Sequence, residues 1–104
     1  MGLDIHLKHE IYHDGITHNM NKMAKACGMY ERLWRADENG VVKAKQLIAT
    51  LVNGIAYMEE HKEELKAKYT PENNWGSYEG LLKFCKNLLR ACVDNPETDV
   101  EVSR

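Results

Sequence analysis

Apolar and polar residues alternate near both ends of the chain. In LDIHLK, residues 3 to 8, every second residue is apolar, and the pattern returns in DVEVS, residues 99 to 103. A period of two is typical of a half-buried β-strand. We therefore expect a short amino-terminal strand within residues 1 to 13 that pairs with a carboxyl-terminal strand. The alternative for the acidic segment 94 to 104 is a frayed tail.

Between the two ends, apolar residues follow helical spacing. From Thr17 onward they recur at positions 20, 23, 24 and 27, and Gly28 is suited to end a helix in the left-handed conformation. We expect Thr17 to cap this first helix, which would span about three turns. MYERLWR then predicts a short second helix, and the turn-forming residues of ADENG follow it.

Two longer helices are expected in the second half of the chain. An apolar stripe that begins near Val42 and reaches Tyr69 predicts the longest helix. Gly54 lies within it, although a glycine lowers helix stability by about 1 kcal/mol relative to alanine. A close helix crossing would need a residue without a side chain, so we expect one there. TPENNWGS is rich in turn residues, and Ser77 can cap the helix that follows it. YEGLLKFCKNLLRAC gives that last helix a continuous apolar stripe, which ends at DNP.

These elements predict a mainly α fold, a compact bundle of three to four helices with a short amino-terminal strand. A chain of 104 residues has room for one hydrophobic core, so we expect a single domain. Within it, residues 1–13 form the strand region, 17–93 the helical core and 94–104 the acidic tail.

Composition and charge exclude several classes of partner. The chain has 43% hydrophobic and 29% charged residues, as globular proteins do. Fourteen basic residues against sixteen acidic ones give no basic surface for a nucleic-acid backbone. No stretch approaches the roughly 20 apolar residues of a membrane span, and the first residues lack a signal-peptide pattern. We expect no membrane or nucleic-acid partner and a location in the bacterial cytosol.

The cysteines and histidines of the chain are its candidate metal ligands. The three cysteines, Cys27, Cys85 and Cys92, all fall on apolar helical faces, where we expect reduced core thiols. Four of the five histidines lie in the first eighteen residues: His6, His9, His13 and His18. On one strand His6 and His9 would point to opposite faces, and HLKHE lacks the helical frame of a zinc-binding motif. We therefore expect no metal site and no cofactor.

No other catalytic pattern is present in the sequence. It has no glycine-flanked serine elbow, phosphate loop or dinucleotide glycine motif. Basic side chains do outnumber acidic ones between residues 22 and 45, namely Lys22, Lys25, Arg32, Arg35, Lys43 and Lys45. They could attract an anionic ligand to the first helix, although a mixed solvated surface is the simpler interpretation. An enzymatic activity is not expected.

Aromatic and amide residues border the turn before the last helix. Trp75 and Tyr78 lie beside two asparagines, a combination that can hold a flat ligand by stacking and by amide hydrogen bonds. The alternative is that the tryptophan fastens the turn to the core. His18 and Asn19 stand in a similar position at the start of the first helix.

Two segments, GITHNMNKMAKACGMYERLWR and PENNWGSYEGLLKF, carry a resemblance to a known family. Together they resemble small uncharacterised phage and prophage proteins with an N-I-T-H-N-L segment, an L-W-R motif and a late N-x-W-G-x-Y-E-x-L motif. The similarity covers roughly residues 3 to 92, and Gly15 replaces the asparagine that usually precedes the isoleucine. The resemblance implies an origin on a mobile element and assigns no activity. It also suggests that the two segments lie together, so that His18, Asn19, Trp75 and Tyr78 line one shallow ligand pocket.

The sequence therefore favours a non-catalytic phage-type binding protein that sequesters a small polar ligand or binds a host protein. One alternative is a metal-assisted hydrolase that uses the amino-terminal histidines. The other is a structural or assembly oligomer, since the third expected helix has enough apolar positions for a homodimer.

Overall fold

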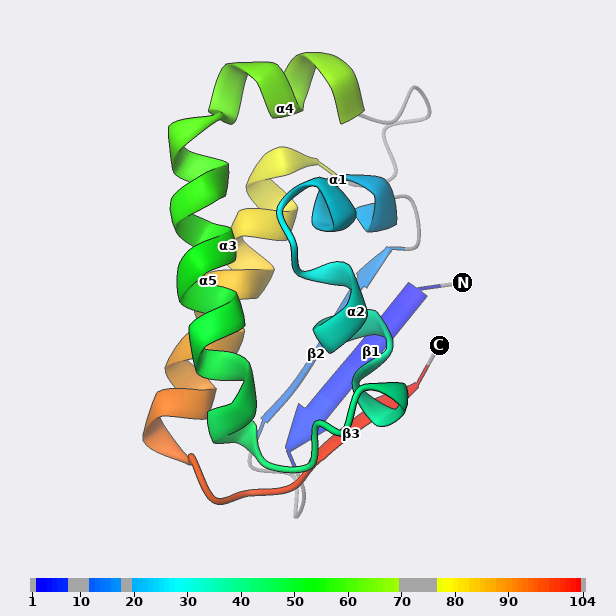
Figure 1. The fold of residues 1–104 in the computed structure, drawn as a ribbon, viewed down its shortest axis with the longest axis vertical. Coiled ribbons are helices and arrows are strands. Elements are labelled where there is room, and N and C mark those ends of the chain that lie inside the picture. Colours follow the sequence, from blue (N-terminus) through cyan, green and yellow to red (C-terminus); the bar gives the residue numbers. More distant parts are fainter. Residues whose placement is uncertain (1, 8–11, 18–19, 70–76, 104) are drawn as a thin grey trace.

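A small sheet and a layer of helices make up the molecule (Figure 1). The computed structural model describes residues 2–7, 12–17, 20–69 and 77–103. Within these ranges five α-helices and three strands surround one hydrophobic core. The fold is mainly α with a small antiparallel sheet, as the sequence predicts.

The sheet joins the two ends of the chain. Its strands are β1 (Gly2–Leu7), β2 (Tyr12–Thr17) and β3 (Val100–Ser103), in the order β2-β1-β3, and both pairings are antiparallel. The expected pairing of the amino-terminal and carboxyl-terminal strands is confirmed. The strand β2 was not expected, because YHDGIT does not alternate apolar and polar residues and contains a glycine.

Leu3, Ile5 and Leu7 of β1 are buried against the helices, whereas Asp4 is exposed and His6 half-buried on the other side. The sheet therefore has one face on the core and one open face. Successive residues of a strand point to opposite faces, so the alternation in the sequence is the direct cause of this division.

The first helix is shorter than predicted. α1 (Asn21–Ala26) begins after Met20, and Thr17 is the last residue of β2, where it pairs with Gly2. The prediction that Thr17 caps the helix is wrong, because the strand pairing uses this residue. Gly28 adopts a φ of 75°, so its predicted role as a left-handed terminator is confirmed. The short second helix is also confirmed as α2 (Tyr30–Trp34).

The long helix predicted from Val42 to Tyr69 is divided. Two 3₁₀ turns, η3 (Ala36–Glu38) and η4 (Ala44–Leu47), precede α3 (Ile48–Glu60), and α4 (Lys62–Tyr69) follows. The break is at His61, whose φ of −113° and ψ of 29° leave the helical region. Its ring stacks on Tyr57 with centroids 4.1 Å apart, and its Nδ1 lies 3.1 Å from the Tyr57 carbonyl oxygen.

The last helix, α5 (Tyr78–Asp94), packs along α3 and is the longest of the described helices. Ser77 caps it as predicted, since its Oγ accepts a 2.9 Å hydrogen bond from the Gly80 amide. Gly54 of α3 is buried, and a Cβ atom there would overlap the side chain of Met29 at the start of α2. The close crossing predicted at Gly54 is therefore present.

Candidate functional site

The predicted pocket residues are only partly within the described structure. His18 and Asn19 lie between β2 and α1, and Trp75 lies before α5; all three fall outside the described residues. The ligand-binding role of these three side chains stays a prediction. Tyr78 is the one member of the set whose surroundings are described.

Tyr78 is a core residue at the start of α5. Its side chain is 2% exposed, and its hydroxyl donates a 2.7 Å hydrogen bond to the backbone carbonyl of Met58 in α3. Burial raises the pKa of the phenol, and the negative charge of Glu59 raises it further. The hydroxyl is therefore neutral at physiological pH and is used to join α5 to α3.

The elements that flank the two predicted segments pack at one end of the molecule. α1, which follows His18 and Asn19, contacts α4, and α4 packs on α5 (Figure 1). Lys66 of α4 also forms a 2.9 Å ion pair with Glu79 of α5, which raises the pKa of the lysine and lowers that of the glutamate. The helix that follows the first predicted segment therefore contacts the helix that precedes the second one.

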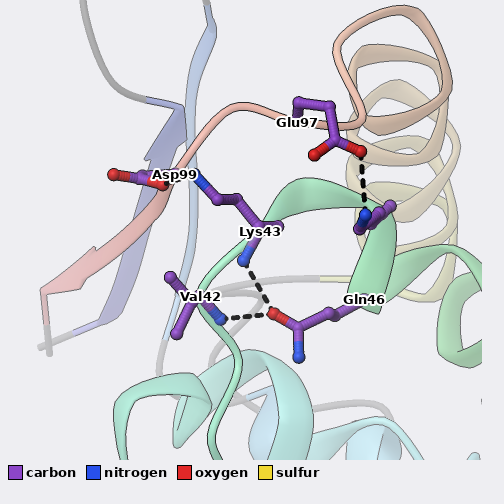
Figure 2. A network of polar contacts seen from close by, with 6 residues as sticks. Val42, Lys43, Gln46, Glu97 and Asp99 are labelled. Atoms are coloured by element: carbon purple, nitrogen blue, oxygen red, sulfur yellow. Dashed lines mark hydrogen bonds and ion pairs between the residues drawn. The ribbon is translucent and has the colours of Figure 1, made fainter.

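Gln46 builds the turn that leads into η4 (Figure 2). Its side-chain oxygen accepts hydrogen bonds from the backbone amides of Val42 (2.7 Å) and Lys43 (2.8 Å), and its side-chain nitrogen donates to the carbonyl of Gly40 at 3.1 Å. Three backbone groups of a tight turn are thus satisfied by one amide. This arrangement is a structural one, since all its partners are backbone atoms of the same turn.

Lys43, which Figure 2 shows beside Gln46, and Lys45 both form ion pairs with the segment before β3. Lys43 pairs with Asp99 at 2.5 Å and Lys45 with Glu97 at 2.8 Å, and the second contact lowers the pKa of Glu97. Backbone hydrogen bonds from the amides of residues 44 and 45 to the carbonyls of residues 98 and 96 run beside these pairs. The acidic segment is therefore docked on the η4 turn.

The proposed anion site between residues 22 and 45 gains no support from these contacts. Besides the two lysines, Arg35 pairs with Glu38 at 3.0 Å, and Arg32 donates to the Gln46 carbonyl at 2.9 Å. Lys25 lies 4.6 Å from the ring centre of Tyr30. Most of the basic side chains in this group already have partners within the protein, which favours the interpretation as a mixed surface.

The three cysteines are free and buried, as predicted. Burial raises the pKa of Cys85 to about 12, and that of Cys27 and of Cys92 to about 11. The thiolate is the reactive form of cysteine, so none of these three groups is a nucleophile at neutral pH. Their role is to fill the core.

His6 is the one amino-terminal histidine whose side chain is described. Its Nε2 lies 2.6 Å from Oε1 of Glu101 across the β1–β3 pairing. Among the described side chains, no three His, Cys, Asp or Glu groups are placed so that they could hold a metal ion. No pattern in the sequence connects these two residues, which are 95 positions apart.

No helix within residues 20–69 and 77–103 is long and apolar enough to span a membrane. Comparison of the chain with protein-family models, with curated proteins and with solved structures gave no match in any of the three.

Proposed function

We propose that this protein is a non-catalytic binding protein of phage or prophage type, which sequesters a small polar ligand or binds a host protein. The binding site would lie where the segment with His18 and Asn19 meets the segment with Trp75. The phage or prophage origin rests on the sequence resemblance alone.

One observation supports the proposal: α4, which precedes the segment with Trp75, contacts both α5, which follows it, and α1, which follows His18 and Asn19. The segment with Trp75 joins α4 to α5, and the segment with His18 and Asn19 ends at α1, so both segments adjoin this group of helices. An imidazole, an amide and an indole near one another can stack on a flat group and hydrogen-bond its edge.

Tyr78 has a supporting part in this proposal. Its hydroxyl is used by the Met58 carbonyl and its ring is buried. It therefore fixes the first turn of α5. Trp75 lies only three residues before Tyr78 in the chain. The ligand contacts fall to His18, Asn19 and Trp75.

The small-ligand arm can be tested by thermal unfolding of the full chain with millimolar AMP, GMP, CMP or UMP. A ligand at 100 times its Kd stabilises the native state by about 2.7 kcal/mol, which is a shift of several degrees in a domain of this size. We expect the shift for at least one nucleotide, its loss in His18→Ala and in Trp75→Ala, and its retention in the control His61→Ala. His61 is a partly exposed histidine at the α3–α4 junction.

The host-protein arm uses the same variants as bait in a bacterial lysate. A specific partner is one that the native protein and His61→Ala retain and that Trp75→Ala releases. If no nucleotide shifts unfolding and no protein shows this pattern, the proposal is wrong. Turnover of a substrate by the purified protein would also contradict its non-catalytic part.

An assembly role is the second candidate, because apolar side chains are exposed along α3. Val52 is 48% exposed and Tyr57 36% exposed on this helix, and Val93 of the neighbouring α5 is 55% exposed. Light scattering at several concentrations tests this role. A monomer at every concentration would remove the homodimer, and a dimer that Val52→Lys dissociates would support it.

A further inference from the structure

The dipeptide Asn-Gly occurs twice in the sequence, in two different backbone settings. Asn39 and Gly40 belong to the exposed turn after η3. Asn53 and Gly54 lie in the middle of α3. An asparagine followed by glycine is especially prone to lose its side-chain ammonia, because glycine has no side chain to shield its backbone nitrogen. The chain therefore carries the same reactive pair once in a turn and once in a helix.

The side chain of Asn39 ties its turn to the end of α2. Its Nδ2 donates hydrogen bonds to the carbonyl oxygens of Glu31 at 3.0 Å and Arg35 at 2.9 Å. Both carbonyls also accept from backbone amides, so the asparagine adds a further donor to each of them. Side-chain donors of this kind stabilise the carboxyl end of a helix, where the carbonyl groups carry partial negative charge.

The backbone nitrogen of Gly40 is open to reaction. Gly40 is exposed, and a Cβ atom on it would meet nothing within 4 Å apart from its neighbours in the chain. Its amide N–H donates no hydrogen bond to any residue that the structure describes. Asn39 has turn geometry, with φ of −111° and ψ of 18°. Rotation of its backbone towards the geometry of attack therefore disturbs an exposed turn, which opens at low cost in free energy.

The second Asn-Gly pair is held in place by its helix. Asn53 is exposed, but Gly54 is buried, and a Cβ atom there would overlap the side chain of Met29. An amide in the middle of a helix donates to the carbonyl four residues earlier, so the nitrogen of Gly54 is engaged. Its backbone can rotate only if α3 opens, and a core helix opens at a far higher cost than an exposed turn.

We propose that Asn39 is a site of spontaneous covalent modification, at which the side-chain amide becomes a carboxylate with water as the only co-reactant. The backbone nitrogen of Gly40 forms a bond to Cγ of Asn39, and the bond from Cγ to Nδ2 breaks. Nδ2 leaves as ammonia and takes with it the proton of the Gly40 amide. Water then opens the cyclic imide at either of its carbonyls, which gives aspartate or isoaspartate.

The conversion replaces a donor with an acceptor at the end of α2. A carboxylate at position 39 would face the carbonyl oxygens of Glu31 and Arg35 without a proton to donate. It would also place a second negative charge directly after Glu38, at the helix end where negative charge is unfavourable. The modified protein therefore has a weaker junction between α2 and η3. The site uses none of the residues of the proposed ligand site, so either proposal can fail alone.

The test is mass spectrometry of tryptic peptides from the full chain kept at 37 °C and pH 8.5, compared with an unaged sample. Trypsin releases Asn39 in peptide 36–43 and Asn53 in peptide 46–62, so the two sites are measured separately. In the folded protein we expect Asn39 to be converted about tenfold faster than Asn53 or more, because α3 must open first. In guanidinium chloride, where the chain is unfolded, the two asparagines should react at similar rates.

A second set of measurements follows the product and its effect. Aspartyl and isoaspartyl forms of peptide 36–43, which separate by chromatography, should both appear. The variant Asn39→Asp should unfold at a lower urea concentration than the native protein, and the control Asn53→Asp should show a smaller change. Equal rates at the two asparagines in the folded protein, or no conversion of Asn39 while the unfolded chain reacts, would mean that the inference is wrong. An Asn39→Asp variant as stable as the native protein would contradict the weakened junction.

Discussion

The hydroxyl of Tyr78 donates a 2.7 Å hydrogen bond to the backbone carbonyl of Met58 and so joins the first turn of α5 to the last part of α3. The bond is buried, because Tyr78 is 2% exposed and Met58 fully enclosed. It holds the start of α5 at the end of the molecule where the ligand site is proposed.

Replacing Tyr78 with phenylalanine should therefore lower the free energy of unfolding by about 1 kcal/mol, the net value of one such hydrogen bond. Urea unfolding measures the change. The matched control is Tyr57→Phe on α3, a tyrosine that is 36% exposed and should change stability by less than about 0.5 kcal/mol. Equal effects of the two substitutions would mean that the buried bond adds nothing to stability.

Gly54→Ala should destabilise the protein although alanine is the better helix former. A Cβ at this buried position overlaps Sδ and Cγ of Met29, so the core must shift at a cost of about 1–3 kcal/mol. Helix propensity alone would predict a gain of about 1 kcal/mol, so the sign of the change decides which effect is larger.

Asn53→Ala, the exposed neighbouring position, is the control for Gly54→Ala and should be neutral or slightly stabilising in the same urea experiment. The double variant Gly54→Ala with Met29→Ala tests the cause. If the contact with Met29 is responsible, the two losses of stability should not add, whereas additive losses would place the effect elsewhere.

The buried thiol of Cys85 should make stability fall in alkaline solution. Its pKa is about 12 in the folded protein and 9.0 as the ordinary value, so the unfolded chain loses this proton first as the pH rises. The contribution is complete below pH 9 and is lost towards pH 12, with a slope of about 1.4 kcal/mol per pH unit for one proton.

Urea unfolding between pH 9 and 10.5 measures this slope, and Cys85→Ala is the comparison. The variant is expected to be less stable throughout, because it leaves a cavity in the core. Its free energy of unfolding should nevertheless fall less steeply with pH than that of the native protein. The difference should be about the slope that one titrating proton contributes. Lysine and tyrosine residues titrate in both proteins, so parallel declines would contradict the role of the thiol.

Much of the fold follows from local patterns in the sequence. The alternation around Ile5 predicts β1, and the apolar stripe after the Ser77 cap predicts α5, because each pattern matches the geometry of one element. The break at His61 has no such signal in the sequence, and in the structure the ring of this residue stacks on Tyr57 of the preceding turn. The residues around Thr17 fit a helix cap locally, and only the pairing with Gly2 places this residue in β2.

The same limit applies to the sites. The contact of His6 with Glu101 joins residues 95 positions apart, and it depends on the pairing of β1 with β3, which spacing along the chain does not reveal. Tyr78 starts α5, as the sequence pattern predicts, but the partner of its hydroxyl is the Met58 carbonyl of another helix. His18, Asn19 and Trp75 lie outside the described residues, so their role stays a prediction of the sequence.

The size of a stability loss can decide whether ion pairs or strand pairing hold the carboxyl-terminal segment. If ion pairs hold the segment, the double variant Glu97→Gln with Asp99→Asn should release it; if strand pairing holds it, removal of residues 100–104 should be far more harmful. Exposed ion pairs are worth about 0–1 kcal/mol each, and the carboxylates of both pairs are at least one-third exposed. We expect the double variant to lose less than about 1 kcal/mol.

Truncation after Asp99 removes the whole pairing of β3 with β1. It also withdraws Val100 and Val102, which pack against the core, and the 2.8 Å hydrogen bond from the Val100 amide to the Val42 carbonyl. Partial burial of two valines and the lost backbone bonds together predict a loss of about 3 kcal/mol in urea unfolding. A truncated protein as stable as the full chain would mean that this segment is a frayed tail in solution, and a large loss in the double charge variant would mean that ion pairs hold it.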